Sequence, residues 1–351
     1  MRKKTKVIKL GNLKIGGDNP ITVQSMTNTD TRDIEATINQ IKLLESAGCE
    51  IIRVAVVDEE AAKSIRFIKD KIKIPLIADI HFDYRLAILS MENGADGIRI
   101  NPGNIGKAVY VKKVIDAAKM HDVAIRIGVN SGSLEKELKS KYGVSAKAMV
   151  ESALKYQQFF EDNGFENMKF SLKASNVMMT IEAYREFSKR SDYPLHLGVT
   201  EAGTFFSGTI KSAVGIGTLL AEGIGDTLRV SLTADPLEEV RVGFEILKAL
   251  GLRERGVDII SCPTCGRCEI NLVELAEKVE KALVVFDKKI SVAVMGCPVN
   301  GPGEAREADY GIAGGRGVGI IFKKGKVVKK VKEEDLLDEF LKILNEDLQY
   351  K

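Results

Sequence analysis

The sequence predicts a (β/α)8 barrel followed by a small α+β domain, and three observations indicate this fold. From about residue 20 to 250, short apolar runs alternate with segments of helical periodicity, which is typical of βα units and a parallel sheet. The runs number eight, which matches a closed barrel better than an open doubly wound sheet of about five or six strands. After about residue 252 the alternation stops and cysteines cluster. We therefore expect domains at 1–251 and 252–351.

Each expected barrel strand is a short apolar run, and a helical pattern follows it. The first helical segment places apolar residues at 34, 38, 41 and 44 on one face and ends before Gly48. The eight runs, in chain order, are ITVQSM, EIIRVAV, PLIADIH, GIRINPG, AIRIGVN, MKFSLKAS, LHLGVTEAG and TLRVSLTA.

Three further segments complete the expected barrel domain. VIKLGNLKIGG, before the first strand, is interpreted as a hairpin that closes the bottom of the barrel. SGSLEKELKSKYG, between the fifth and sixth strands, is expected to be an inserted loop and helix. The last barrel helix has the clearest start, with Asp235 as N-cap, Pro236 at the first position, and Glu238 and Glu239 in its first turn.

The second domain has a different pattern. A helix is expected to begin near Asn271, followed by the strand ISVAVMG, the loop CPVNGPGEA, Gly-rich short strands, and a helix from Glu333 to about Leu348. GIAGGRGVG lacks the strand, the helix and the acidic residue of a dinucleotide fingerprint, so we interpret it as a Gly-rich strand turn. KKGKVVKKVK is interpreted as a lysine-protected edge strand, with docking of an acidic electron donor as the alternative.

Composition excludes several classes of protein. With 351 residues, 44% hydrophobic and 29% charged, the chain is neither disordered nor collagen-like and can bury a sizeable core. Lys and Arg total 52 against 49 Asp and Glu, a balance that argues against a nucleic-acid or membrane-surface partner. The N-terminal MRKKTKVIKL lacks the features of a signal peptide, and no long apolar stretch occurs, so a cytoplasmic protein is expected.

Five predicted strands each carry one cation near the carboxyl end, where TIM barrels place their chemistry. Alternation along a strand lets such a residue face the lumen while its neighbours pack against helices. Each one alone is more simply a salt-bridged surface residue. Together they favour a ligand with more than one phosphate, because guanidinium groups match phosphate oxygens bidentately. The five are Arg53, Arg99, Arg126, Lys173 and Arg229.

Polar residues at other strand ends add hydrogen-bonding and acid–base groups to this mouth. Asp79 and His81 are two residues apart and therefore share a face, although a structural role is the commoner one for such a histidine. Glu201, in GVTEAG, lies between small residues beside the predicted cations, where it could move a proton or pair with one arginine. The remaining polar positions are Asn101, Asn130, His196 and Ser231.

The cysteine pattern indicates a metal rather than disulfides. Cys262, Cys265 and Cys268 are separated by two two-residue spacings, which suits a cubane iron–sulfur cluster. Structural zinc sites more often use two separated pairs, which makes zinc the weaker alternative. Cys297 adds a fourth candidate thiolate, and the carboxylate of Glu304 is close enough in sequence to enter the same site. Spacing alone favours the four cysteines, and composition does not rank Glu304 over Cys268.

Six motifs spread over nearly the whole chain carry a resemblance to a known family. They are ITVQSMTNTDT, ADIHFDYRLA, RINPGN, GVTEAG, SCPTCGR and GCPVNGPGEA. On these motifs the chain resembles the family of 4-hydroxy-3-methylbut-2-enyl diphosphate synthases of the methylerythritol phosphate route to isoprenoid precursors, in its two-domain bacterial form. The resemblance implies a (β/α)8 barrel and reductive ring opening of 2-C-methyl-D-erythritol 2,4-cyclodiphosphate with loss of water. It also implies a 4Fe-4S cluster that passes single electrons from flavodoxin or ferredoxin.

The resemblance assigns roles to individual residues. It implies that Cys262, Cys265, Cys297 and Glu304 hold the cluster. Cys268 then becomes a packing residue near the cluster, which overrides the choice made on spacing. Glu201 matches a proton donor or hydrogen-bond partner near the carbon that loses oxygen. The positions implied to bind substrate are Arg53, Arg99, Arg126, Asn130, Lys173, Arg229 and Ser231, with His81 and His196 at further polar positions of the mouth.

The two expected domains pose a geometric problem. A domain that follows the last barrel helix starts at the amino-terminal face of the barrel, whereas substrate is expected at the carboxyl-terminal face. The resemblance implies a head-to-tail homodimer, in which the cluster domain of one chain caps the barrel of the other. Such closure would exclude water from a reduced intermediate.

Other classes of function compete with this interpretation. One is a phosphate-binding TIM-barrel transferase of the pterin type with a structural zinc module, and another is an electron carrier, for which a cationic barrel has no evident purpose. Metal content and colour separate them, because a cubane cluster is brown and zinc is colourless. A radical S-adenosylmethionine enzyme is disfavoured because its cysteines would follow the first barrel strand, and ITVQSM has none.

Overall fold

The structure is a computed structural model that describes residues 2–283, 286, 288–297 and 305–349. Contacts divide the chain into two compact units, Met1–Arg253 and Glu254–Lys351. The boundary expected after residue 251 lies close to this division. No helix of the described residues is long and apolar enough to span a bilayer.

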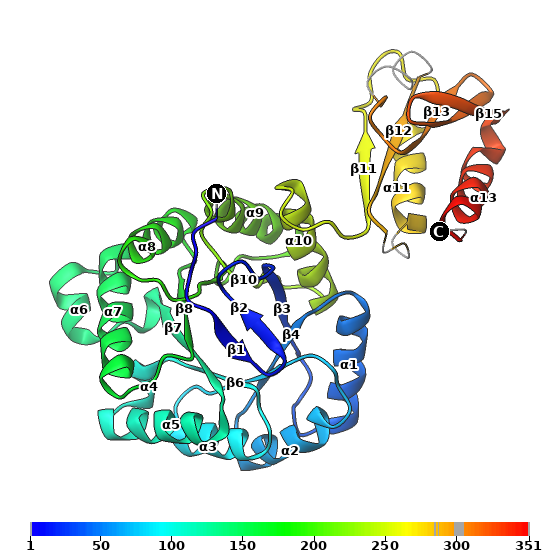
Figure 1. The fold of residues 1–351 in the computed structure, drawn as a ribbon. Coiled ribbons are helices and arrows are strands. Elements are labelled where there is room, and N and C mark those ends of the chain that lie inside the picture. Colours follow the sequence, from blue (N-terminus) through cyan, green and yellow to red (C-terminus); the bar gives the residue numbers. More distant parts are fainter. Residues whose placement is uncertain (1, 284–285, 287, 298–304, 350–351) are drawn as a thin grey trace. The chain divides into compact units, whose positions relative to one another are not determined.

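The first unit is a (β/α)8 barrel, as the sequence predicts. Each predicted run contains one strand, and the eight strands are β3 (Thr22–Met26), β4 (Ile51–Ala55), β5 (Leu76–Asp79), β6 (Gly97–Ile100), β7 (Ala124–Asn130), β8 (Met168–Lys173), β9 (His196–Leu197) and β10 (Thr227–Leu228). They are parallel in the order β8-β7-β6-β5-β4-β3-β10-β9. An isolated parallel bridge between Phe170 and Leu195 joins the two ends, so the sheet closes into the ring seen in Figure 1.

Helices surround the ring of strands (Figure 1). The layer consists of α1 (Ile34–Ser46), α2 (Glu59–Lys69), α3 (Tyr84–Glu92), α5 (Ala108–His121), α7 (Ala146–Asp162), α8 (Val177–Arg190), α9 (Phe205–Ala221) and α10 (Pro236–Ala249), with a short α4 (Pro102–Ile105). The predicted insertion after the fifth strand is the 3-10 turn Ser131–Ser133 and α6 (Lys136–Tyr142). Asp235 caps α10 as predicted, because its side chain accepts a hydrogen bond from the N–H of Leu237.

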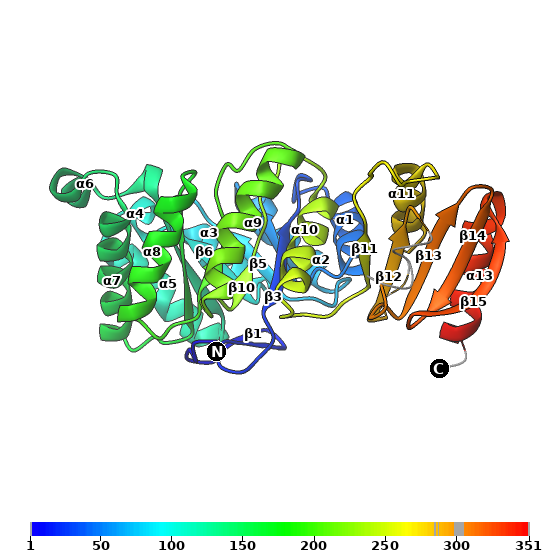
Figure 2. The ribbon, with the colours of Figure 1, turned by 90° about the horizontal axis from the view of Figure 1, so that it is seen from above.

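An amino-terminal hairpin closes one end of the barrel, as the sequence predicts. Its strands β1 (Ile8–Leu10) and β2 (Leu13–Ile15) are antiparallel; they lie across the ring in Figure 1 and at one end of the barrel in Figure 2. Ile51 and Ala124 begin β4 and β7, so the covered end is the one where the barrel strands start. The opposite end is left for chemistry. The hairpin and the strand starts form one buried apolar cluster of Ile8, Leu10, Ile15, Ile51, Ile77 and Ala124.

The described residues of the second unit form a five-stranded sheet and the two α-helices α11 and α13, which confirms the predicted α+β class. Its elements are β11 (Val257–Ser261), α11 (Leu272–Leu283), β12 (Ile290–Met295), β13 (Tyr310–Gly315), β14 (Val318–Lys323), β15 (Lys326–Lys332) and α13 (Leu336–Gln349). The strands follow chain order, with β11, β12 and β13 parallel and the other neighbours antiparallel. The sequence analysis did not predict β11, in which Val257 is the only buried residue.

Two glycine- and lysine-rich motifs of this unit are placed as predicted. GIAGGRGVG forms the β13–β14 hairpin, in which Gly315 lies opposite Val318 and Gly317 has a positive φ of 70°. This conformation favours glycine, because it has no Cβ. KKGKVVKKVK contributes β15, the outermost strand of the sheet, whose lysines are exposed. The edge-strand interpretation is confirmed, and docking of an electron donor on this strand stays a prediction.

Candidate functional site

Strand alternation turns the predicted cations into the barrel lumen. Ile52 and Val54 have no exposed surface and pack in the core between strands and helices, so Arg53 between them points the other way. In the strand register, Arg99 of β6 lies beside Asp79 on one neighbour and Arg126 on the other. Arg99, Arg126 and Lys173 are likewise flanked by buried core residues. These are Ile98 and Ile100, Ile125 and Ile127, and Leu172 and Ala174, respectively.

Asp79 is a carboxylate shared by several of these cations. It is 3% exposed, and its Oδ1 accepts a hydrogen bond from Nη1 of Arg99 at 3.3 Å. Its Oδ2 lies 3.9 Å from Nε of Arg53 and 3.5 Å from Nε2 of His81. Burial acts to raise the pKa of Asp79, but Arg53, His81 and Arg99 lower it more, so the net pKa lies well below its ordinary value. Asp79 is therefore ionised at neutral pH.

A second buried carboxylate, Glu239 of α10, holds Arg229. Its two oxygens lie 3.2 Å and 3.3 Å from Nε and Nη2 of Arg229, and it also accepts hydrogen bonds from the Leu232 N–H at 3.0 Å and the Ser25 hydroxyl at 3.4 Å. The sequence analysis placed Glu239 in the first turn of the helix without a role in the site. Nothing in the local pattern distinguishes it from the neighbouring Glu238, which instead pairs with Arg241 on the same helix.

Arg126 and Lys173 have no carboxylate partner among the described residues. Arg126 is 2% exposed, and its Nε and Nη1 have no hydrogen-bond partner there. Burial and the nearby Arg53 lower the pKa of Arg126, and burial and Arg126 lower that of Lys173. Burying these charges is costly because, among the described residues, Asp79 and Glu239 pair with only three of the five cations, namely Arg53, Arg99 and Arg229. The arrangement can bind an anion of more than one charge.

Glu201 lies in the loop that follows β9. Its side chain is exposed, and its backbone has a φ of 52°, the left-handed region that a residue other than glycine seldom adopts. The N–H of Thr200 donates to the carbonyl of Ala174 at 3.2 Å, which attaches this loop to the residue after Lys173. Strained backbone of this kind clusters at functional sites, so it makes Glu201 a candidate for one.

The other predicted polar residues divide into two groups. Asn130 ends β7 opposite Lys173 in the register, and Ser231, half-buried, follows β10. His196 instead is fully buried at the start of β9, where its Nδ1 lies 2.7 Å from Oγ1 of Thr227. The structure therefore places His196 inside the barrel below the mouth. Asn101 caps α4 and donates to the Ser133 hydroxyl at 2.7 Å, which is a structural role.

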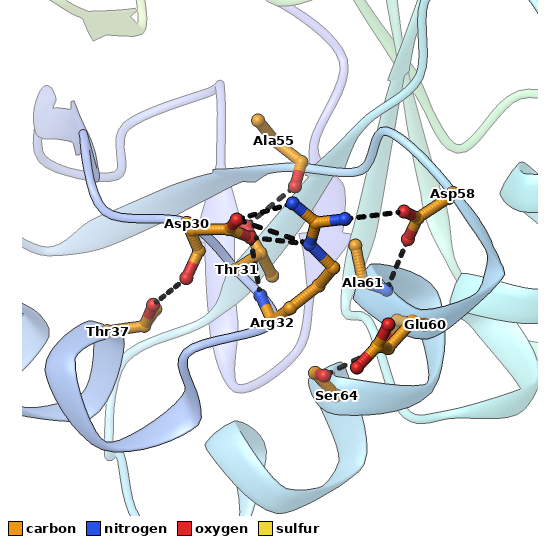
Figure 3. A network of polar contacts seen from close by, with 9 residues as sticks. All are labelled: Asp30, Thr31, Arg32, Thr37, Ala55, Asp58, Glu60, Ala61 and Ser64. Atoms are coloured by element: carbon orange, nitrogen blue, oxygen red, sulfur yellow. Dashed lines mark hydrogen bonds and ion pairs between the residues drawn. The ribbon is translucent and has the colours of Figure 1, made fainter.

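A polar network braces two loops at the mouth (Figure 3). Arg32 reaches Asp30 at 2.6 Å and Asp58 at 3.1 Å, and so connects the loop after β3 with the start of α2. The Thr31 hydroxyl donates to the carbonyl of Ala55, the last residue of β4, at 2.6 Å. Arg32 lowers the pKa of Asp30 to about 2. The network fixes the end of the strand that contributes one of the mouth cations.

The cysteines of the second unit follow two adjacent parallel strands. Cys262 comes directly after β11 and Cys297 shortly after β12, and the register places Ser261 opposite Val294. The two cysteines therefore lie at the same edge of the sheet, where the backbone N–H of Gly296 donates to Sγ of Cys262 at 3.4 Å. Among the described residues, no three or more Cys, His, Asp or Glu side chains are gathered tightly enough to hold a metal ion. The predicted ligand Glu304 lies outside the described residues.

The sulfur atoms differ in their hydrogen bonds. Cys265 is exposed, and the backbone N–H and the side chain of Arg267 lower its pKa. Sγ of Cys268 instead donates to the carbonyl of Ile270 at 3.3 Å. A thiolate that binds iron accepts N–H donors, so Cys262 and Cys265 fit an iron–sulfur cluster better than Cys268 does. A Cβ on Gly296 would lie 2.6 Å from Sγ of Cys268, so a side chain at 296 would displace that thiol.

Comparisons with known proteins agree across both units. The model of the GcpE TIM-barrel domain matches residues 5–244, and the model of the GcpE protein C-terminal domain matches residues 258–346. A relative from Caldanaerobacter subterraneus subsp. tengcongensis, 4-hydroxy-3-methylbut-2-en-1-yl diphosphate synthase (flavodoxin), is 65% identical over 97% of each chain. A relative of the same name from Geobacter sulfurreducens is 61% identical over 96% of each chain. Another, from Fusobacterium nucleatum, is 58% identical over 100% of this chain and 99% of its own.

Solved structures extend the comparison to the fold alone. Dihydropteroate synthase from Yersinia pestis superposes with a TM-score of 0.51 at 11% identity, covering 70% of this chain and 97% of that one. The enzyme from Stenotrophomonas maltophilia gives 0.53 at 13% identity with the same coverage. The share of this chain that these structures cover, 70%, is close to the length of its first unit, Met1–Arg253. The shared feature is therefore the barrel. At such low identity the likeness carries no argument about activity.

Proposed function

Because the chain belongs to the GcpE family, we propose that it opens the ring of 2-C-methyl-D-erythritol 2,4-cyclodiphosphate to give 4-hydroxy-3-methylbut-2-en-1-yl diphosphate. The reaction takes up two electrons, which break one carbon–oxygen bond to phosphate. The hydroxyl on the neighbouring carbon leaves with a proton as water, and a double bond remains. The observation that carries the proposal is the excess of buried cations over carboxylates in the barrel mouth, which suits a diphosphate.

Different residues of the mouth are proposed to contact the substrate and to orient the groups that contact it. Arg126 and Lys173, which have no carboxylate partner among the described residues, would contact the diphosphate most directly. Asp79 and Glu239 hold other cations in place, so that the guanidinium groups are oriented before substrate arrives. The proposed binding set is Arg53, Arg99, Arg126, Lys173 and Arg229, with Asn130, Ser231 and His81 as polar contacts and His196 below them.

Glu201 is proposed to serve the proton transfer. Its loop is attached to the residue after Lys173, which brings a carboxyl group to the side of the diphosphate site. There it would give the proton that lets the hydroxyl leave as water, or hold that hydroxyl by a hydrogen bond. The left-handed backbone at Glu201 supports this role, because such strain persists where a side chain has to be held in one place.

The second unit is proposed to hold a 4Fe-4S cluster through Cys262, Cys265, Cys297 and Glu304. When bound, the cluster supplies single electrons to the substrate. The hydrogen bonds to the sulfurs support Cys262 and Cys265, and the shared sheet edge supports Cys297. The relatives' name makes flavodoxin the proposed electron donor.

The proposed domains are 1–251 for substrate and 252–351 for the cluster, and they are proposed to work as a head-to-tail homodimer in the cytoplasm. A test is to mix two inactive variants, Arg126→Met in the barrel and Cys262→Ser in the cysteine unit. Capping in trans predicts that mixed dimers recover activity at one of their two sites. Activity of an isolated monomer, measured after gel filtration, would contradict the dimer.

Metal analysis tests the proposed function as a whole. Anaerobically purified protein should contain about four irons and four sulfides per chain and show a brown cluster spectrum. Addition of the cyclodiphosphate to dithionite-reduced protein should change that spectrum and release the linear diphosphate. One zinc without sulfide, in protein that cannot be reconstituted with iron, would reduce the second unit to a structural module and contradict the proposal.

A further inference from the structure

Lys169 lies inside the barrel, beneath the proposed diphosphate site. It belongs to β8, four residues before Lys173, and is 1% exposed. Its neighbours Met168 and Phe170 pack in the core between strands and helices, so Lys169 points into the lumen. In the register it lies opposite Arg126 of β7. Its ammonium group therefore faces the site from below.

The layer around Lys169 is rich in polar atoms without partners. Its Nζ has no hydrogen-bond partner among the described residues, and the same is true there of Nε2 of His196, whose pKa is lowered by burial and in part by Lys169. Buried polar atoms in proteins are almost always hydrogen-bonded, to protein or to ordered water. Lys169 and His196 therefore keep unused hydrogen-bonding capacity below the proposed anion site.

Burial and nearby positive charges disfavour the protonated form of Lys169 in the ligand-free protein. Burial and Arg126 lower the pKa of Lys169 to about 7, whereas Asp226 acts to raise it. Asp226 is already engaged by Arg2 at 2.6 Å and by the Leu195 N–H at 2.8 Å, which limits its effect. His196 faces Lys169 from β9, and burial together with Arg126 lowers its pKa as well. With Lys173 above it on the same strand, Lys169 lies in a layer dominated by positive charge.

We propose that Lys169 is a positioning residue for the diphosphate, and that it takes up a proton when the anion binds to Arg126. This inference rests on the proposed function. The anion reverses the sign of the potential at the buried amine, so the charged form becomes favourable. A cyclic diphosphate has no group that titrates near neutral pH, since each phosphorus carries one strongly acidic oxygen. The proton therefore enters on the protein, and the resulting ammonium holds Arg126 and its ligand from below.

Proton uptake has a measurable consequence for affinity. Protonation and ligand binding are linked reciprocally, so a site that gains one proton binds its ligand more weakly as pH rises. If Lys169 takes up about one proton, the Kd of the cyclodiphosphate should rise about tenfold from pH 8 to pH 9. Below pH 7 Lys169 is charged before binding, and the dependence should fade.

Calorimetry on the oxidised, cluster-loaded protein tests this directly. The cyclodiphosphate is titrated at pH 8 in two buffers of different ionisation enthalpy, without reductant, so that no turnover occurs. The wild type should take up about one proton per site. Lys169→Arg stays charged at every pH used and should show no uptake and a Kd independent of pH. Lys169→Met should also show no uptake and should bind about tenfold more weakly at pH 7. Lys112→Met, on the exposed face of α5, is the matched control and should behave as the wild type.

Each outcome decides between the proposals. Proton uptake that persists in both Lys169 variants, or that is absent in the wild type, would overturn the role of Lys169. The proposed function would still stand in either case, provided that the wild type binds the cyclodiphosphate. Failure of the wild type to bind the cyclodiphosphate would contradict the proposed function, and the role of Lys169 falls with it. Circular dichroism of the variants confirms that a change in binding does not come from unfolding.

Discussion

The barrel mouth and the cysteine-bearing edge of the second sheet are built in opposite ways. In the mouth, each of the five cations lies on or directly after its own strand and is mostly buried, and carboxylates orient part of the set. At the cysteine edge, the candidate ligands follow strand ends in loops, and Cys265 is exposed. The barrel is preorganised for the proposed anion at a cost in charge repulsion, whereas the proposed metal centre would be completed by the metal itself.

This difference determines how each region should respond to substitution. Removing a metal ligand takes away the group that holds its neighbours together, and function is lost with it. Removing a mouth cation weakens binding but also relieves repulsion, so the free protein becomes more stable. The predictions below test this contrast.

The largest effect is expected at the cysteine edge. Cys262→Ser should lower the iron content severalfold and reduce turnover by more than about a hundredfold, because a ligand at the sheet edge is lost. Cys268→Ala is the matched control, since its thiol donates to a carbonyl, and it should leave the cluster largely intact. Iron analysis and the visible spectrum measure both variants. A loss of iron in the control equal to that of Cys262→Ser would restore the all-cysteine ligand set.

Substitution of Arg126 in the mouth should weaken substrate binding but stabilise the ligand-free protein. Arg126→Met should raise the Kd of the cyclodiphosphate about a hundredfold, because a desolvated cation that faces the anion is lost. The same change should raise the melting temperature of the ligand-free protein, since the removed guanidinium has unpartnered nitrogens and lies near Arg53 and Arg99. Calorimetric titration and thermal unfolding measure the two effects. A lower melting temperature would show that Arg126 contributes packing that outweighs its charge.

Glu201 should affect the chemical step more than binding. Glu201→Gln keeps the shape and the hydrogen-bonding capacity of the side chain but removes the acid, so turnover should fall about a hundredfold. The Kd of the cyclodiphosphate should change less than about threefold, because this residue is outside the cationic set. Single-turnover kinetics with reduced protein separates the two quantities. Unchanged turnover would remove the proton-transfer role.

The smallest effect is a pH dependence of stability that comes from Lys169. Its pKa in the folded state, about 7, lies below the ordinary value of 10.5, so between these values the unfolded state binds more protons. Stability contributed by this residue should therefore increase with pH from about 7 upward, by at most about 1.4 kcal/mol per pH unit. Denaturant unfolding of the barrel at pH 7, 8 and 9 measures the slope, and subtraction of the Lys169→Met slope isolates it. Equal slopes in the two proteins would assign the dependence elsewhere.

Much of the fold was predictable because its signals are local. Alternating runs and helical periods locate the eight barrel strands, and the Asp235–Pro236 pair locates the start of α10. The strand β11 was not predicted: its apolar residues Val257, Ile259 and Ile260 follow the end of the barrel alternation, and only Val257 is buried. The cation on each of five strands was also visible, since a charged residue between buried apolar neighbours stands out within one strand.

The sequence by itself determined which residues enter the lumen, because side-chain direction along a strand depends only on alternation. Tertiary structure decided which of them are paired. Arg229 is held by Glu239 of the next helix and Arg99 by Asp79 of the next strand, while Arg126 and Lys169 have no ion-pair partner among the described residues. It also placed His196 below the mouth rather than at it. These outcomes depend on strand register and on the closing of the ring, which bring together residues far apart in sequence. Because only part of the cations are paired in this way, the mouth keeps an excess of positive charge that a diphosphate would neutralise.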